Sequence, residues 1–89
     1  MTSGHQMAAQ VSLYPLRQLS IGPTIREAVR IFEGQGLRVR VGEMSTLVWG
    51  EEHRVFQALQ RAFHHAAQEG DAVMCVTLSN ACPGPGEKA

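Results

Sequence analysis

The sequence has no surplus of either charge and no cluster of basic residues. Lysine plus arginine and aspartate plus glutamate each number 8, so the formal net charge is +0 with neutral histidines. Nucleic-acid binding needs a positive surface to neutralise phosphates, and this composition gives it no support. No apolar run approaches the roughly 20 residues of a membrane span. The first residues also lack the charged and apolar segments of a signal peptide, so we expect a cytoplasmic protein without nucleic-acid or membrane partners.

Cysteine is scarce, and the two residues present, Cys75 and Cys82, are poorly spaced for chemistry. Their separation fits neither a zinc ribbon nor a C-x-x-C redox pair. Cys75 falls within an apolar run of β-formers, and we expect it to be a buried free thiol in a reducing compartment. The state of Cys82, which precedes a proline, is left open.

Motifs of nucleophilic catalysis and phosphate binding are also absent. No serine stands in a G-x-S-x-G elbow, and no G-x-x-x-x-G-K loop occurs. The glycines of residues 34–36 follow a predicted helix and precede a strand, the reverse of a dinucleotide-binding turn. His64 and His65 are neighbours on a predicted helix and diverge by about 100°, which favours two solvated side chains over a shared metal ion. We therefore predict no catalytic residue, no metal and no cofactor, and we expect that the protein is not an enzyme.

The strongest pattern in the sequence spans residues 42–70. Residues 45–49 are a short run of β-formers closed by Gly50. Glu51 and Glu52 then suit the positive end of a helix, and Gly70 suits an αL cap just beyond its other end. Apolar residues recur between these ends at steps of three and four, so one helix face should lie in the core. The residues of this stripe are Val55, Phe56, Leu59, Ala62, Phe63, Ala66 and Ala67.

Three more strands and a second helix follow from the same criteria. Residues 8–16 and 37–41 alternate between apolar and other side chains, as half-buried strands do, and Pro15 should mark a strand end or a bulge. Pro23 suits the first position of a helix, with Ser20 or Gly22 as its cap and an end near residues 34–36. Residues 72–79 are nearly all apolar or β-branched, which predicts a central or doubly covered strand.

The element order is therefore β-α-β-β-α-β, the ferredoxin-like α+β arrangement. Right-handed crossovers would place both helices on one face of a four-stranded antiparallel sheet. We expect one domain over residues 8–80, a disordered leader over residues 1–7 and a flexible tail over residues 81–89. The core of an 89-residue chain is small, and such chains often gain stability by self-association.

The remaining chemistry is that of a small-molecule binder. A pocket for a flat heterocycle needs an aromatic or thioether wall and a few hydrogen-bonding groups. Tyr14, Met44 and Trp49 offer the wall, and Glu43 offers an acceptor for amino groups or a cation. Hydroxyls and an amide come from Ser12, Ser45, Thr46, Ser79 and Asn80. Structural roles also remain open: Trp49 in the core, Glu43 as an ordinary hairpin carboxylate, and the hydroxyls on an outer strand face.

Several short segments, in their order and spacing, resemble the thiamine and hydroxymethylpyrimidine-binding proteins of the YkoF-like group. The similarity runs from about Ala9 to Gly84. The segments are residues 12–16 (Ser-Leu-Tyr-Pro-Leu), residues 44–46 (Met-Ser-Thr) with Gly50 beyond them, residues 55–59 (Val-Phe-Gln-Ala-Leu), and Ser79 followed by residues 82–84 (Cys-Pro-Gly).

The resemblance implies a ferredoxin-like domain that binds thiamine or its hydroxymethylpyrimidine half without catalysis, in thiamine salvage or transport. It also implies that a one-domain chain associates into a homodimer or homotetramer. The ligand-binding residues that it implies are Ser12, Tyr14, Glu43, Met44, Ser45, Thr46 and Ser79.

Two other functions remain open from the sequence. The first is an interaction module without a ligand, whose polar sheet face, with Tyr14, Arg38 and Arg40, joins subunits. The second is a small dimeric enzyme of the ferredoxin-like monooxygenase type, for which the sequence offers no identifiable base.

Overall fold

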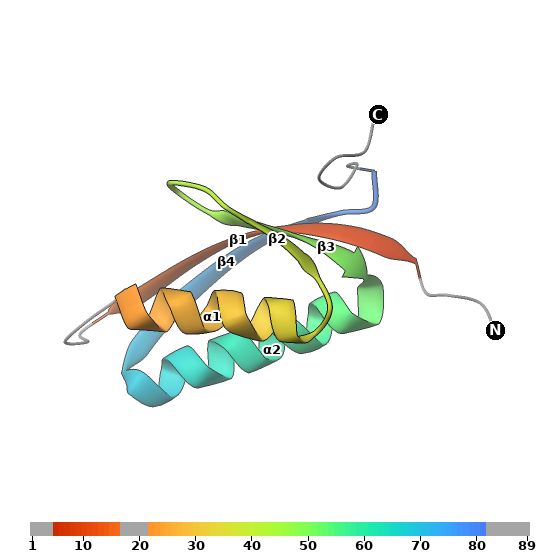
Figure 1. The fold of residues 1–89 in the computed structure, drawn as a ribbon. Helices are drawn as coiled ribbons and strands as arrows, with labels where there is room; N and C mark the ends of the chain where they lie inside the picture. Colours follow the sequence, from red (N-terminus) through yellow and green to blue (C-terminus); the bar gives the residue numbers. More distant parts are fainter. Residues whose placement is uncertain (1–4, 17–21, 82–89) are drawn as a thin grey trace.

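The computed structural model describes residues 5–16 and 22–81, and within them the predicted order of elements is confirmed (Figure 1). Residues 1–4, most of the predicted tail and Cys82 lie outside the described residues. The elements are β1 (Gln6–Leu16), α1 (Gly22–Gly34), β2 (Arg38–Val41), β3 (Thr46–Glu51), α2 (Glu52–Glu69) and β4 (Asp71–Ser79).

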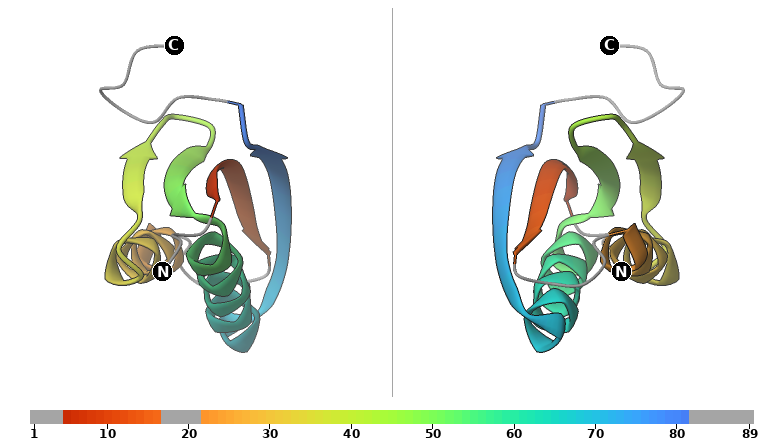
Figure 2. Two further views of the ribbon diagram at one scale, coloured as in Figure 1. Left: turned by 90° about the vertical axis from the view of Figure 1, so that its right-hand side faces the viewer. Right: turned by 90° about the vertical axis from the view of Figure 1, so that its left-hand side faces the viewer.

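The four strands form one antiparallel sheet in the order β2-β3-β1-β4. Both helices pack on the same face of this sheet, α1 on the side of β2 and α2 on the side of β4, and the other face is left open (Figure 2). The predicted ferredoxin-like α+β fold is therefore confirmed. Because β1 lies inside the sheet, it positions residues from both halves of the chain.

The core lies between the sheet and the two helices. Alternation along β1 sends Ala9 and Val11 toward the helices, and both are buried. Val48 of β3 lies opposite Ala9 in the register and is fully buried. The other buried core residues are Ala28, Phe32, Leu37, Val55, Ala58 and Ala62.

Two glycines fix the path from α1 into the β2–β3 hairpin. Gly36 has a φ of 81°, and its N–H donates to the Glu33 carbonyl while that of Leu37 donates to the Phe32 carbonyl. These two bonds form a Schellman motif, whose left-handed residue is usually glycine. Leu37 then packs directly over Gly50, where a Cβ would collide with the Leu37 side chain. A side chain at position 50 would therefore force the Leu37 side chain to shift from its place in the core.

Some predicted boundaries are corrected by the structure. The strand predicted to begin at residue 8 begins at Gln6, so the leader does not extend to residue 7. The Glu52 N–H at the start of α2 donates to the His5 carbonyl at 2.7 Å, which ties this end of β1 to the helix. Gly70 ends α2 with φ 153° and ψ −164°, so it is not the αL cap that was predicted.

The prediction of a central or covered β4 is wrong. β4 is an edge strand, and Cys75 on it is exposed rather than buried.

The predicted apolar stripe of α2 is also too wide, because Phe56 and Phe63 are 49% and 41% exposed. Composition reports how apolar a segment is, but the strand order and the width of the helix layer decide what covers it.

Neither helix in the described part of the chain is long and apolar enough to cross a membrane.

Candidate functional site

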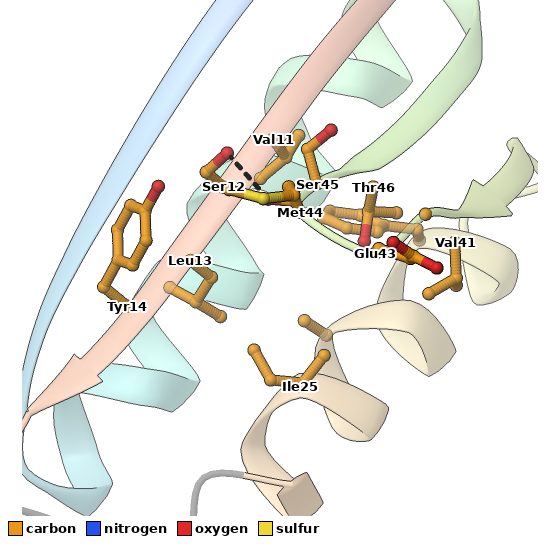
Figure 3. A pocket seen from close by; sticks show the side chains of 13 residues that line it. Val11, Ser12, Leu13, Tyr14, Ile25, Val41, Glu43, Met44, Ser45 and Thr46 are labelled. Carbon is orange, nitrogen blue, oxygen red and sulfur yellow. Dashed lines mark hydrogen bonds between the residues drawn. The ribbon is translucent and has the colours of Figure 1, made fainter.

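A cavity of about 340 Å³ lies between β1, the β2–β3 hairpin and α1 (Figure 3). It draws residues from three elements that are distant in sequence. The residues that line it are Val11, Ser12, Leu13, Tyr14, Ile25, Ala28, Phe32, Val41, Gly42, Glu43, Met44, Ser45 and Thr46.

The register of the sheet explains why the cavity forms at this place. Pairing between β1 and β3 ends at Val11 opposite Thr46. Pairing between β1 and β4 continues to Leu16 opposite Asp71. The second half of β1 therefore has a strand on one side only, and the hairpin turn diverges from it on the other. The opening between them is the cavity.

The floor of the cavity is apolar. Ala28 and Phe32 of α1 are buried beneath it, and Ile25 lies one turn earlier on the same helix. Leu13 projects from β1 toward Ile25 (Figure 3). Such a floor can hold the face of a ring by dispersion and by exclusion of water.

The hairpin turn is held near β1 by two side-chain hydrogen bonds. The Ser12 hydroxyl donates to the Met44 carbonyl at 3.4 Å, and Gln10 Nε2 donates to Ser45 Oγ at 3.3 Å. Within the turn, the Gly42 N–H donates to the Ser45 carbonyl at 2.8 Å. The two cross-links are long for hydrogen bonds, whereas the turn itself is closed by a short one. The backbone bond therefore closes the turn more firmly than the two side-chain bonds link it to β1.

Polar groups and a thioether stand around the rim. Figure 3 shows Tyr14 beside β1, on the other side of the strand from Leu13 and Ile25, and Glu43, Thr46 and Val41 on the side of the hairpin. Met44 extends from the turn toward Ser12 and is 84% exposed. The rim thus combines hydroxyls, one carboxylate, one thioether and one phenol above an apolar floor.

Six of the seven residues predicted to bind a ligand line this one cavity. The seventh, Ser79, does not: it lies opposite Ala8 at the far end of β1, and its Oγ accepts the Ala81 N–H at 3.0 Å. Trp49 and Asn80, which were also considered for the pocket, are absent from its lining. Because β4 runs antiparallel to β1, the end of β4 is carried away from the hairpin turn.

The apolar lining was not predicted as part of the site. By their spacing, Ile25, Ala28 and Phe32 fall on one apolar stripe of α1, and Leu13 and Val41 fall on the apolar faces of their strands. Nothing in their periodicity separates a residue that fills the core from one that floors a cavity. Only the end of the β1–β3 pairing reveals the difference.

The cavity lining holds several hydrogen-bonding groups and few ionisable ones. Across residues 5–16 and 22–81, no three histidine, cysteine, aspartate or glutamate side chains gather closely enough to hold a metal ion. Glu43 is the lone ionisable carboxylate in the lining. The arrangement suits a small, flat ligand that carries both an apolar face and polar edges.

Comparison with known proteins begins with the family. Residues 6–85 match the model of the YKOF-related family. No significant match was found among curated proteins.

Several solved structures share the fold. A hypothetical protein from Methanocaldococcus jannascii has a TM-score of 0.79 at 21% identity, over 96% of this chain and 88% of that chain. A domain of unknown function from Bacillus cereus has a TM-score of 0.74 at 20% identity, over 86% of this chain and 76% of that chain. A proposed thiamine biosynthesis/salvage protein from Thermotoga maritima has a TM-score of 0.71 at 16% identity, over 82% of this chain and 81% of that chain.

At these identities the structural similarities establish the fold alone. The family match is more specific, because it extends from the first residue of β1 to beyond the end of β4. The chain therefore belongs to the YKOF-related family.

Proposed function

We propose that this protein binds thiamine or its hydroxymethylpyrimidine half, without catalysis, in thiamine salvage or transport. The observation that carries the proposal is the convergence of Ser12, Tyr14, Glu43, Met44, Ser45 and Thr46 on one cavity. Membership of the YKOF-related family and the name of the Thermotoga maritima neighbour support the choice of ligand.

The size of the cavity suits one ring. Ligand pockets commonly measure about 300–1,000 Å³, and this one is about 340 Å³. A pyrimidine ring would lie on Leu13 and Ile25, with Met44 closing over its other face. The rest of a thiamine molecule would then extend past the exposed turn.

The edges of an aminopyrimidine match the groups on the rim. Its exocyclic amine would donate to the hydroxyl oxygen of Ser45 or Thr46, and a ring nitrogen would accept from the other hydroxyl. The Glu43 carboxylate would lie near the cation that thiamine carries. A ligand that leaves one of these groups unpaired loses on the order of 1–3 kcal/mol for that group. Selectivity would arise from this penalty.

Calorimetry tests the proposal directly. Thiamine and hydroxymethylpyrimidine are titrated into the wild type and into the Ser45→Ala/Thr46→Ala variant. We expect the variant to bind at least tenfold more weakly, since it loses two hydrogen-bonding groups of about 1 kcal/mol each. Ser79→Ala is the matched control, because its hydroxyl lies outside the cavity.

Two results would contradict the proposal. Equal affinity of the wild type and the Ser45→Ala/Thr46→Ala variant would remove the hairpin from the site. If the wild type binds neither compound, the interaction module is favoured. A thermal-shift assay separates a ligand-binding protein from an interaction module, because a ligand that binds only the native state raises the melting temperature.

We also propose that the protein functions as a homo-oligomer. The exposed apolar side chains support this proposal, since Tyr14, Phe56 and Leu78 are each more than two-fifths exposed in the single chain.

A further inference from the structure

The hydrogen bonds between β1 and the hairpin turn decide which hydroxyls on the cavity rim can donate to a ligand. A serine hydroxyl holds one hydrogen and two lone pairs, so a bond to a neighbour determines what remains for a ligand. Two serines of the lining, Ser12 and Ser45, each have such a neighbour. The protein therefore sets the polarity of this part of the rim.

The Ser45 hydroxyl is an acceptor toward the protein. Its Oγ accepts from Gln10 Nε2 at 3.3 Å, and an amide nitrogen donates but does not accept. The hydroxyl hydrogen of Ser45 therefore points away from Gln10. Among the described residues this hydroxyl has no other hydrogen-bond partner, so its hydrogen remains for a ligand.

The Ser12 hydroxyl has the opposite polarity. Its hydrogen is directed to the Met44 carbonyl at 3.4 Å. A carbonyl oxygen cannot donate, so the two roles in this bond cannot be exchanged. Ser12 therefore offers a ligand the lone pairs of its oxygen.

The two hydroxyls lie on the same side of the turn. Side chains alternate along β1, so Gln10 and Ser12 share the open face of the sheet. Ser45 is on that side as well, because its Oγ contacts Gln10. Figure 3 shows both serine hydroxyls directed away from Leu13 and Ile25. The rim thus presents a donor and an acceptor side by side.

This pattern matches one edge of an aminopyrimidine. In such a ring, a nitrogen that can only accept lies next to an exocyclic amine that donates. The oxo analogue has an oxygen in place of the amine, and its pattern is reversed, because a ring nitrogen carries a hydrogen and the oxygen accepts. Two donors or two acceptors that face each other remain unpaired, which weakens binding.

We infer that Gln10 is a positioning residue that makes Ser45 a hydrogen-bond donor and thereby selects an aminopyrimidine over its oxo analogue. The Ser45 hydroxyl donates to the ring nitrogen, and the exocyclic amine donates to the oxygens of Thr46 and Ser12. Gln10 does not line the cavity, so it acts on the ligand through Ser45. The inference rests on the proposed function, because it concerns the same ligand in the same cavity.

A weak bond is sufficient for this role. The bond between Gln10 and Ser45 is long and exposed, so it contributes little to the free energy of unfolding. Its effect on selectivity has a different origin, since a Ser45 hydrogen turned toward Gln10 would place two donors against each other. The role of Gln10 should therefore appear in the choice between ligands and hardly at all in stability.

Replacement of the Gln10 amide by a carboxylate tests the inference, because Gln10→Glu reverses the polarity and keeps the shape. A carboxylate can only accept, so the Ser45 hydrogen turns toward it and Ser45 offers lone pairs to the ligand. Calorimetry with hydroxymethylpyrimidine and its oxo analogue measures the ratio of the two affinities. We expect the wild type to bind the amine at least tenfold more tightly than the oxo analogue. We expect Gln10→Glu to bind both compounds equally or to prefer the oxo analogue.

Two further variants separate polarity from charge and from the loss of the side chain. Arg40→Gln changes the net charge by the same amount, and Arg40 lies opposite Leu47, which lies opposite Gln10. We expect this variant to keep the affinity ratio of the wild type. Gln10→Met keeps an unbranched side chain without a donor, so the Ser45 hydroxyl can rotate, and we expect an intermediate ratio. Gln10→Met also tests the role of Gln10 if Gln10→Glu does not fold.

The outcomes distinguish a failure of this inference from a failure of the proposed function. A wild type that binds both compounds equally, or a ratio that is unchanged in Gln10→Glu and Gln10→Met, would overturn the role of Gln10 and leave the ligand in place. An equal change of the ratio in Arg40→Gln would assign the effect to charge and would also overturn it. If the wild type binds neither compound, the proposed function fails and the inference fails with it.

Discussion

The two halves of β1 belong to one continuous strand but have different neighbouring strands. The first half pairs with β3 up to Val11 and, from Ala8 onward, with β4 as well, and it contains Ala9, which is 1% exposed. The second half is paired with β4 alone, and its Tyr14 is 49% exposed. One strand thus serves the core at one end and leaves a cavity at the other. The comparison shows that the end of a strand pairing, rather than a special motif, creates the candidate site.

The largest expected effect is on stability, for a substitution in the first half of β1. Ala9→Asp places a carboxylate in the core without a partner, and we expect a loss of about 3–5 kcal/mol in the free energy of unfolding. The matched control is Gln10→Asp, the next residue on the same strand, whose side chain is exposed. We expect a loss below about 1 kcal/mol for the control. Urea denaturation measures both, and equal losses would show that the two faces of β1 do not differ as described.

An intermediate effect is expected at Glu43, in the hairpin turn beside the second half of β1. Glu43→Gln removes the carboxylate of the rim but keeps a hydrogen-bonding group of the same shape. Because the carboxylate is exposed, we expect thiamine, which carries a cation, to bind up to about fivefold more weakly. Hydroxymethylpyrimidine, which lacks the cation, should change less. Calorimetry with both compounds checks this difference, and an identical loss for both would place Glu43 beside the amine instead of the cation.

The smallest effect is expected at the boundary between the halves. Ser12→Ala removes the 3.4 Å hydrogen bond to the Met44 carbonyl. A long, solvent-exposed bond contributes little, so we expect a loss of about 0.5 kcal/mol or less in unfolding free energy. Hydrogen exchange at residues 42–45 should nevertheless become faster, because the turn loses one of its two links to β1. Unchanged exchange would show that the Ser12 hydrogen bond does not help to hold the turn.

The element order could be predicted because each element has its own periodicity. The alternation of β1 and the spacing of Ile25 and Phe32 on α1 both reflect local geometry, which the sequence records directly. The clustering of Glu43, Met44, Ser45 and Thr46 could also be predicted, since these residues are consecutive.

Contacts that depend on register and strand order could not be predicted. Ser79 was placed in the site because its type suited a ligand, but its position opposite Ala8 follows from the antiparallel register of β4. Cys75 was expected to be buried because an apolar strand is usually covered by other elements. The local sequence does not indicate which elements cover the strand. β4 is thus the element in which composition and exposure disagree most.

Amide chemical-shift mapping with hydroxymethylpyrimidine tests the central claim most directly. If the ligand binds in the cavity beside the second half of β1, we expect shifts at residues 12–14 and 42–46. Residues 76–79 of β4 should stay unchanged and serve as an internal reference. Shifts confined to β4 or to the open face around Trp49, or no shifts at saturating ligand, would contradict the assignment of the site.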